Sequence, residues 1–146
     1  MVSAGVDVGV KTIKVTILKD NQVIASNKGP TKGFERAKAA EEVWSEALGD
    51  AKVSAADVSA VIATGTGKRD VGFATNNVVE PVADVRGTLY LAPKSKTLID
   101  IGAEQIRVVN YDENGKVVNY TLNQQCGAGL GYFIDSIARM LGVTVN

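Results

Sequence analysis

Two short segments of the chain share a pattern in which an aspartate stands between two apolar residues and a glycine follows. They are Val6-Asp7-Val8-Gly9 and Ile99-Asp100-Ile101-Gly102. A polyphosphate is held by backbone N–H groups at close approach, which glycine allows, and by carboxylates that hold its magnesium ion through water. Each segment offers both kinds of group at a predicted turn between antiparallel strands. Two such hairpins facing one another would clamp a magnesium-bound polyphosphate, whereas a single copy is typical of an ordinary hairpin turn.

Neighbouring residues extend this candidate phosphate site. Lys11 and Thr12 would add a positive charge and a hydroxyl group to the first turn. Gly65-Thr66-Gly67-Lys68 follows a short apolar strand, and its glycines would also let the backbone approach phosphate. The segment lacks the G-x-x-x-x-G-K-[ST] spacing of a P-loop, so by itself it does not distinguish a phosphate site from a plain turn.

The chain has one cysteine, Cys126, and no histidine. This composition excludes an internal disulfide, a histidine-based catalytic triad and the common zinc sites. Cys126 lies in a glycine-rich segment just before a predicted helix, where the helix dipole would favour a thiolate that can bind iron. The alternative is that Cys126 is a small buried apolar residue, as many single cysteines are.

Length, composition and charge describe one globular domain. The chain has 146 residues, of which 45% are apolar, and its 16 basic residues balance 16 acidic ones. This balance gives no overall field that would favour nucleic acid or an anionic membrane. No apolar run approaches the roughly 20 residues that span a bilayer, and no signal peptide pattern is present, so the expectation is a soluble cytoplasmic protein.

Hydrophobic periodicity predicts an α/β fold in which a mixed sheet is flanked by helices. Tyr90 and Trp44 are expected in the core or at an interface, and Val82, Val85 and Leu89 are expected to face inward with Tyr90. Gly49 and Gly142 are expected to end helices. The predicted elements are a hairpin over 4–18, a strand over 22–28, a helix over 33–48, a capped segment over 54–57, a strand over 59–64, a helix over 80–91, strands over 97–101, 105–111 and 116–122, and a helix before residue 142.

The motifs at 5–9, 63–69, 99–104 and 123–131, in this order and at this spacing, together resemble the BadF/BadG/BcrA/BcrD ATPase family. That family contains ATPase subunits of benzoyl-CoA reductase and activators of 2-hydroxyacyl-CoA dehydratases. The resemblance covers nearly the whole chain. It implies a ribonuclease H-like lobe of the actin-like ATPases.

The resemblance also implies roles for individual residues. Asp7 and Asp100 would hold Mg²⁺ through water, and Glu104 would orient the water that attacks ATP. Cys126 would be a ligand of a 4Fe-4S cluster shared with an identical or homologous ATPase subunit. ATP binding would then drive an electron to a CoA-ester reductase or dehydratase, with no role for nucleic acid or membrane. The residues whose turns would hold the nucleotide are Gly9, Val10, Lys11, Thr12, Gly65, Gly67, Gly102 and Ala103.

The sequence departs from the family pattern in two places. Family members continue through a second lobe that holds the adenosine and a second cysteine, so we expect 1–146 to be one N-terminal lobe, with 123–146 starting the cluster segment and the second lobe. Ala103-Glu104-Gln105 also replaces the Gly-Gln-Asp of most activators, which favours the benzoyl-CoA reductase branch. Two alternatives stay open: an iron-free small-molecule kinase of the same superfamily, and a non-catalytic lobe that acts in oligomerisation or regulation.

Overall fold

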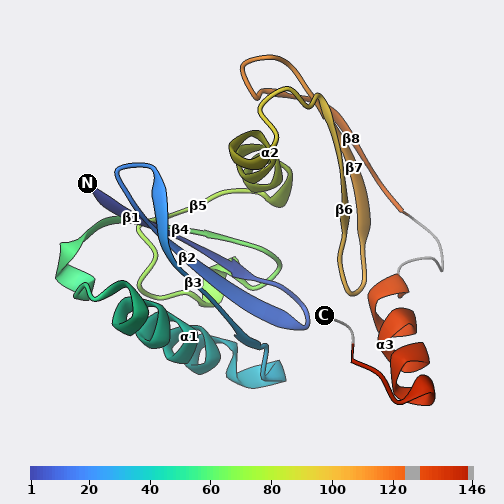
Figure 1. The fold of residues 1–146 in the computed structure, drawn as a ribbon, viewed down its shortest axis with the longest axis horizontal. Helices are drawn as coiled ribbons and strands as arrows, with labels where there is room; N and C mark the ends of the chain where they lie inside the picture. Colours follow the sequence, from blue (N-terminus) through green and yellow to red (C-terminus); the bar gives the residue numbers. More distant parts are fainter. Residues whose placement is uncertain (124–128, 145–146) are drawn as a thin grey trace. The chain divides into compact units, whose positions relative to one another are not determined.

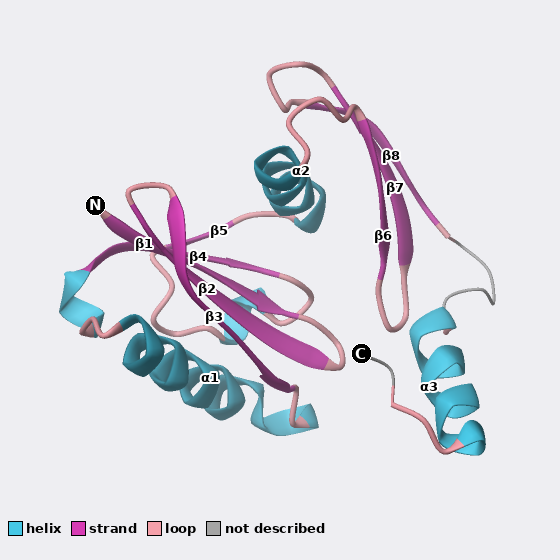
Figure 2. Cartoon of the chain, viewed as in Figure 1, coloured by secondary structure: helices cyan, strands magenta, loops and turns pink. Residues whose placement is uncertain are grey.

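The computed structural model describes residues 1–123 and 129–144 of the chain. These residues form two compact units, Met1–Val79 and Glu80–Asn146. Figure 1 labels the elements along the chain, and Figure 2 colours them by type. Each unit is an α/β assembly in which helix and sheet occur together, as the periodicity predicts.

The first unit is a five-stranded mixed sheet with the strand order β3-β2-β1-β4-β5. The hairpin of β1 and β2 is antiparallel, and β4 pairs with β1 in parallel. Helix α1 lies along one face of this sheet (Figure 1). The bounds are β1 Val2–Val8, β2 Thr12–Lys19, β3 Gln22–Pro30, α1 Arg36–Ala51, β4 Val58–Thr64 and β5 Asn76–Asn77.

Alternation along β1 and β2 builds the core of this unit. Every second side chain of the two strands is buried, because the two faces of a strand alternate. Trp44 of α1 is buried against this core and stacks on Phe73, with ring centroids 5.1 Å apart. This confirms the core position predicted for Trp44. The fully buried strand residues of largest volume are Val6, Val8, Ile13, Val15 and Ile17.

The prediction that Gly49 ends the first helix is wrong. A 3-10 turn at Gly33–Glu35 precedes α1, and α1 continues through Gly49 to Ala51. Lys52 ends the helix because it adopts the left-handed conformation, with φ of 54°, and its N–H is donated to the carbonyls of Gly49 and Leu48. A glycine usually takes this position, and here a lysine does so instead.

The capped segment before β4 forms as predicted. Ser54 caps the 3-10 turn Ala55–Asp57, and the carboxylate of Asp57 accepts hydrogen bonds from the backbone N–H and the hydroxyl of Ser54, at 2.8 and 2.6 Å. The bond from the Ser54 N–H to the Asp57 carboxylate is the one by which the third residue of a capping box satisfies the backbone of the cap residue.

The second unit contains helix α2 and the three-stranded antiparallel sheet β6-β7-β8. Val85, Val109 and Tyr111 form its buried apolar cluster, with Leu89 packed against them. The inward orientation predicted for Val82 and Tyr90 is wrong, since these side chains are 40% and 54% exposed. Within this unit, α2 packs on the small sheet through Val85 and Leu89. The bounds are α2 Glu80–Leu91, β6 Thr97–Ile101, β7 Ile106–Tyr111, β8 Val117–Leu122 and α3 Leu130–Leu141.

The described part of α3 ends as the sequence predicts. Gly142 has a left-handed φ of 67° and its N–H is donated to the carbonyl of Arg139. Across 1–123 and 129–144, no helix combines the length and the apolar character needed to cross a lipid bilayer.

Candidate functional site

The turn between β1 and β2 is held in one shape by its own backbone and by the end of β3. The N–H of Gly9 is donated to the carbonyl of Thr12 at 3.1 Å. Thr31 donates its hydroxyl to the carbonyl of Gly9 at 2.9 Å and its N–H to the carbonyl of Lys11 at 2.9 Å. A Cβ at Gly9 would lie 2.9 Å from the carbonyl oxygen of Thr12, so this tight turn favours glycine.

The glycine turn after β4 packs directly on this hairpin. The register of the parallel pair places Thr64 beside Asp7. Gly65 has a φ of +86°, and a Cβ there would lie 2.5 Å from both the Asp7 carboxylate and the Val8 carbonyl oxygen. Gly67 donates its N–H to the carbonyl of Val8 at 3.0 Å. The structure therefore places Gly65 against Asp7, and both predicted glycines, Gly65 and Gly67, against Val8.

The Asp7 carboxylate has a basic partner that the sequence analysis missed. Lys14 lies directly opposite Asp7 in the β1–β2 ladder, and its Nζ is 2.8 Å from Asp7 Oδ2. The Lys14 and Asp7 side chains are 54% and 35% exposed, so the pair lies at the surface of its unit. A lysine ammonium can also pair with phosphate.

The turn between β6 and β7 repeats the geometry of the first turn. The N–H of Gly102 is donated to the carbonyl of Gln105 at 2.8 Å, which spans the same number of residues as Gly9 to Thr12. A Cβ at Gly102 would again approach the carbonyl three residues ahead, at 3.2 Å. The N–H groups of Gly9, Gly67 and Gly102 thus hold the turns in shape, and any role of the neighbouring amides toward phosphate stays a prediction.

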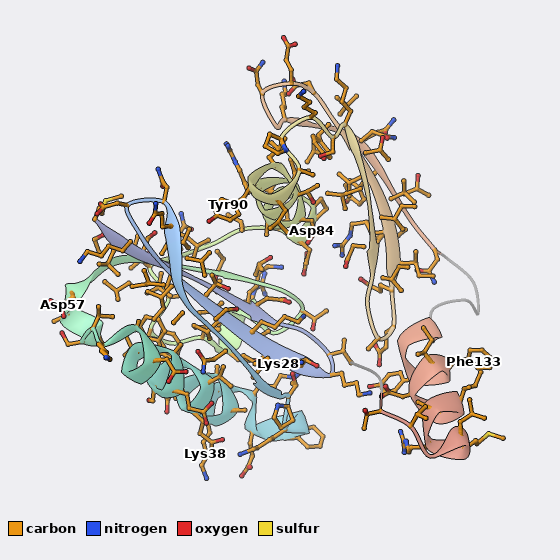
Figure 3. The ribbon with its side chains drawn as sticks, in the orientation of Figure 1. Lys28, Lys38, Asp57, Asp84, Tyr90 and Phe133 are labelled. Atoms are coloured by element: carbon orange, nitrogen blue, oxygen red, sulfur yellow. The ribbon has the colours of Figure 1, made fainter. Side chains whose placement is uncertain are left out.

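Arg107 is the second basic partner that the sequence analysis missed. It lies opposite Asp100 in the β6–β7 ladder, and its side chain is only 7% exposed. Its Nη1 donates to Asp84 Oδ2 of α2 at 2.8 Å and to Asp100 Oδ2 at 3.4 Å. Figure 3 labels Asp84 on α2.

One spacing rule would have found both basic partners. Lys14 and Arg107 each follow their aspartate by seven residues. Because each hairpin has the same turn length, aspartate and base face each other across the ladder and share one face of the sheet. The repeated signal is therefore Asp-x-Gly followed by a basic residue at the fifth position after the glycine.

The remaining predicted residues lie in the turn between β6 and β7 or outside the described residues. Ala103 and Glu104 lie within the turn, and the Glu104 side chain is exposed. A Cβ at Gly131 of α3 would lie 2.7 Å from the Ala103 Cα, so the start of α3 lies against this turn. Cys126 lies outside the described residues.

The two aspartates belong to different units, so the clamp between the hairpins remains a prediction. Carboxylate oxygens that are partly exposed, as in Asp7 and Asp100, suit a hard cation such as Mg²⁺. In the part of the chain that the structure describes, no group of three or more His, Cys, Asp or Glu side chains could enclose a metal ion by itself.

A family model described as the BadF/BadG/BcrA/BcrD ATPase family matches residues 4–146. One of the benzoyl-CoA reductase subunits of Thauera aromatica is 32% identical, over 97% of this chain and 51% of the relative. The chain spans about half the length of the curated relatives it matches.

Two solved structures share the fold over almost the whole chain. One is the activating component of the Acidaminococcus fermentans (R)-2-hydroxyglutaryl-CoA dehydratase, with a TM-score of 0.88 and 30% identity over 99% of this chain and 55% of that one. The other is the activator of the 2-hydroxyisocaproyl-CoA dehydratase from Clostridium difficile with bound ADPNP, with a TM-score of 0.86 and 29% identity over 99% and 53%. The chain thus has the α/β fold of the actin-like ATPases, with a mixed sheet flanked by helices, as the sequence predicts.

Proposed function

Because the chain belongs to the BadF/BadG/BcrA/BcrD ATPase family, we propose that it forms the phosphate-binding part of an ATPase that activates a CoA-ester reductase or dehydratase. One observation carries this proposal: two hairpins repeat the same turn, with an aspartate and an opposing basic residue at the same positions. The relatives support it, since one is a subunit of benzoyl-CoA reductase and another is a dehydratase activator that binds ADPNP.

In the proposed reaction, water attacks the γ-phosphorus of ATP, the bond from that phosphorus to the bridging oxygen breaks, and ADP and phosphate are released. Asp7 and Asp100 would hold the metal through water, Lys14 would compensate phosphate charge beside Asp7, and exposed Glu104 would orient the attacking water. Mg²⁺, when bound, supplies electrostatic stabilisation of charge on the phosphate oxygens. The backbone of the turns fixes the phosphates in place; these residues are Gly9, Val10, Lys11, Thr12, Gly65, Gly67, Gly102 and Ala103.

The first test is ATP hydrolysis by the natural protein that carries this sequence. We expect Asp100→Asn to abolish phosphate release, because an amide no longer offers the charge that holds the metal. Glu113→Gln is a matched charge control, since Glu113 is exposed at the β7–β8 turn, away from the second hairpin's turn. Unchanged turnover in Asp100→Asn would refute the assigned role.

The proposal includes electron transfer through a 4Fe-4S cluster held by Cys126 together with thiolates from elsewhere in the assembly. A cluster of this type needs about four thiolates, and this chain has one cysteine. The partner would be an identical or homologous ATPase subunit. A cytoplasmic location is part of the same proposal, and cell fractionation tests it.

Iron analysis tests this second half of the proposal. We expect the anaerobically reconstituted protein to bind iron and sulfide with a visible absorption band, and Cys126→Ser to lose both. Ser136→Ala, on α3, is the control. Equal iron in wild type and Cys126→Ser would contradict the ligand role.

Cys126 distinguishes this proposal from one alternative, an iron-free small-molecule kinase of the same superfamily. Such an enzyme transfers the phosphoryl group to a small molecule instead of water, and it does not need Cys126. ATP turnover that depends on an added acceptor and is unaffected in Cys126→Ser would support this alternative.

A further inference from the structure

We propose that Arg107 is a positioning residue that fixes the carboxylate of Asp100, and that Asp84 of α2 in turn holds Arg107. This inference rests on the proposed function, in which Asp100 holds the metal of a bound nucleotide. It assigns a task to two residues, Arg107 and Asp84, that lie outside the repeated Asp-x-Gly motif. All three residues belong to the second unit.

The contacts of Arg107 link helix α2 to the hairpin of β6 and β7. One guanidinium nitrogen, Nη1, serves both carboxylates, at 2.8 Å from Asp84 and 3.4 Å from Asp100. The other, Nη2, donates to Oε1 of Gln105 at 3.5 Å, and Gln105 closes the turn by accepting the N–H of Gly102. Arg107 therefore contacts the helix, the turn and the aspartate at once.

Burial explains why this arrangement should hold its geometry. The Arg107 side chain is 7% exposed, whereas those of Asp84 and Asp100 are 26% and 41% exposed. A buried guanidinium that loses its carboxylate becomes an uncompensated charge, so the ion pair resists opening. Its planar shape also fixes the directions of its hydrogen bonds.

The first hairpin provides the contrast. Lys14, in the position that corresponds to Arg107, is 54% exposed. An exposed lysine pair exchanges readily with water and contributes little to stability. We therefore expect the buried guanidinium of Arg107 to keep its position more firmly than the exposed ammonium of Lys14.

A double-mutant cycle on thermal unfolding tests the positioning contact directly. We expect the fall in Tm of Asp100→Asn/Arg107→Met to be clearly smaller than the sum of the two single falls, because each single change already breaks the pair. Additive falls would overturn the proposal. If Arg107→Met does not fold, the same cycle is measured with Arg107→Lys, which keeps the charge but loses the planar fork.

Magnesium dependence tests the consequence for the site. In Arg107→Lys and in Asp84→Asn we expect the Mg²⁺ concentration for half-maximal binding of an ATP analogue to rise about tenfold, a typical effect of losing a residue that orients a metal ligand. Arg86→Met is the matched control, since Arg86 is an exposed arginine of α2, and it should leave this concentration unchanged. Equal Mg²⁺ dependence in a folded Arg107→Lys protein would overturn the positioning role.

The double-mutant cycle and the Mg²⁺ dependence distinguish a failure of the positioning role from a failure of the proposed function. A wild-type protein that binds no nucleotide at any Mg²⁺ concentration would count against the proposed function. The double-mutant cycle would still decide whether Arg107 holds Asp100, because it needs no ligand.

Discussion

At the scale of single residues, close backbone contact decides which side chains the candidate site tolerates. Gly65 combines a left-handed φ of +86° with backbone and carboxylate oxygens where a Cβ would stand. These oxygens belong to Asp7 and Val8, so Gly65 packs the end of β4 against the hairpin of β1 and β2. Substitution here should disturb both the fold and the aspartate.

Gly65→Ala should lower the free energy of unfolding by about 2 kcal/mol or more, because a non-glycine residue at positive φ is strained and its Cβ meets the Val8 carbonyl. Urea denaturation measures the change. Gly72→Ala is the control, since a Cβ at Gly72 has nothing within 4 Å and no positive φ. Equal stabilities of the two variants would contradict the packing described for Gly65.

Asp57 provides a prediction on pH. The side-chain hydrogen bond from Ser54, followed by its backbone hydrogen bond, holds the pKa of Asp57 below its ordinary value. A lowered pKa in the folded state means that the capping box stabilises above the unfolded pKa, about 3.9. Its contribution is lost as the pH falls through the folded pKa.

Carbon-detected NMR titration of the Asp57 carboxyl checks this direction. In Ser54→Ala we expect the pKa of Asp57 to move back up toward its ordinary value, since the hydroxyl donor is gone. Figure 3 labels Asp57, which is exposed on its unit. An unchanged pKa in Ser54→Ala would show that the hydroxyl is not the main cause.

At the scale of elements, the turn between β2 and β3 is set by its own residues, whereas the end of α1 is not set by its glycine. β2 and β3 are joined through Asp20 and Asn21, which have positive φ of 51° and 64°, as a two-residue hairpin turn requires. Helix α1 instead passes through Gly49 and ends at Lys52. A glycine inside a helix costs stability relative to alanine.

Gly49→Ala should therefore stabilise the protein by about 0.5–1 kcal/mol, since a Cβ there meets nothing within 4 Å. Thermal or urea unfolding measures the gain. Gly29→Ala is the contrasting variant, because a Cβ on β3 would lie 2.6 Å from Val43 of α1 and should destabilise. A loss of stability in Gly49→Ala would argue against the helical position of this glycine.

At the scale of the whole molecule, the two units differ in how much apolar surface they bury. In the described residues of the first unit, the sheet and α1 share one large apolar cluster around Val6, Ile13 and Trp44. The described cluster of the second unit is formed by Val85, Val109 and Tyr111. Local stability follows buried apolar contacts.

Hydrogen exchange should accordingly be slower in β1, β2 and β4 than in β6, β7 and β8. Mass spectrometry of peptic peptides measures this difference on the intact chain. Amides of the α1 segment serve as an internal reference within the first unit. Faster exchange in the first sheet than in the second would contradict the order of stabilities inferred from burial.

The sequence alone determined the local parts of this protein. Strand alternation and turn residues identified both hairpins and the paired aspartates, Asp7 and Asp100, because a strand and its turn are set by neighbours in the chain. The combined motifs also identified the family and the fold. The same spacing could have revealed Lys14 and Arg107, since a fixed turn length fixes which residues face each other.

Tertiary structure decided the features that depend on residues far apart in the chain. Only packing places Gly65 and Gly67 against Val8, and only packing brings Asp84 of α2 to Arg107. Tertiary structure also decided that Val82 and Tyr90 are exposed. The helical period predicts which residues of α2 share a face, but it does not predict how much of that face the sheet covers. Such contacts depend on where whole elements meet, and no local pattern records that.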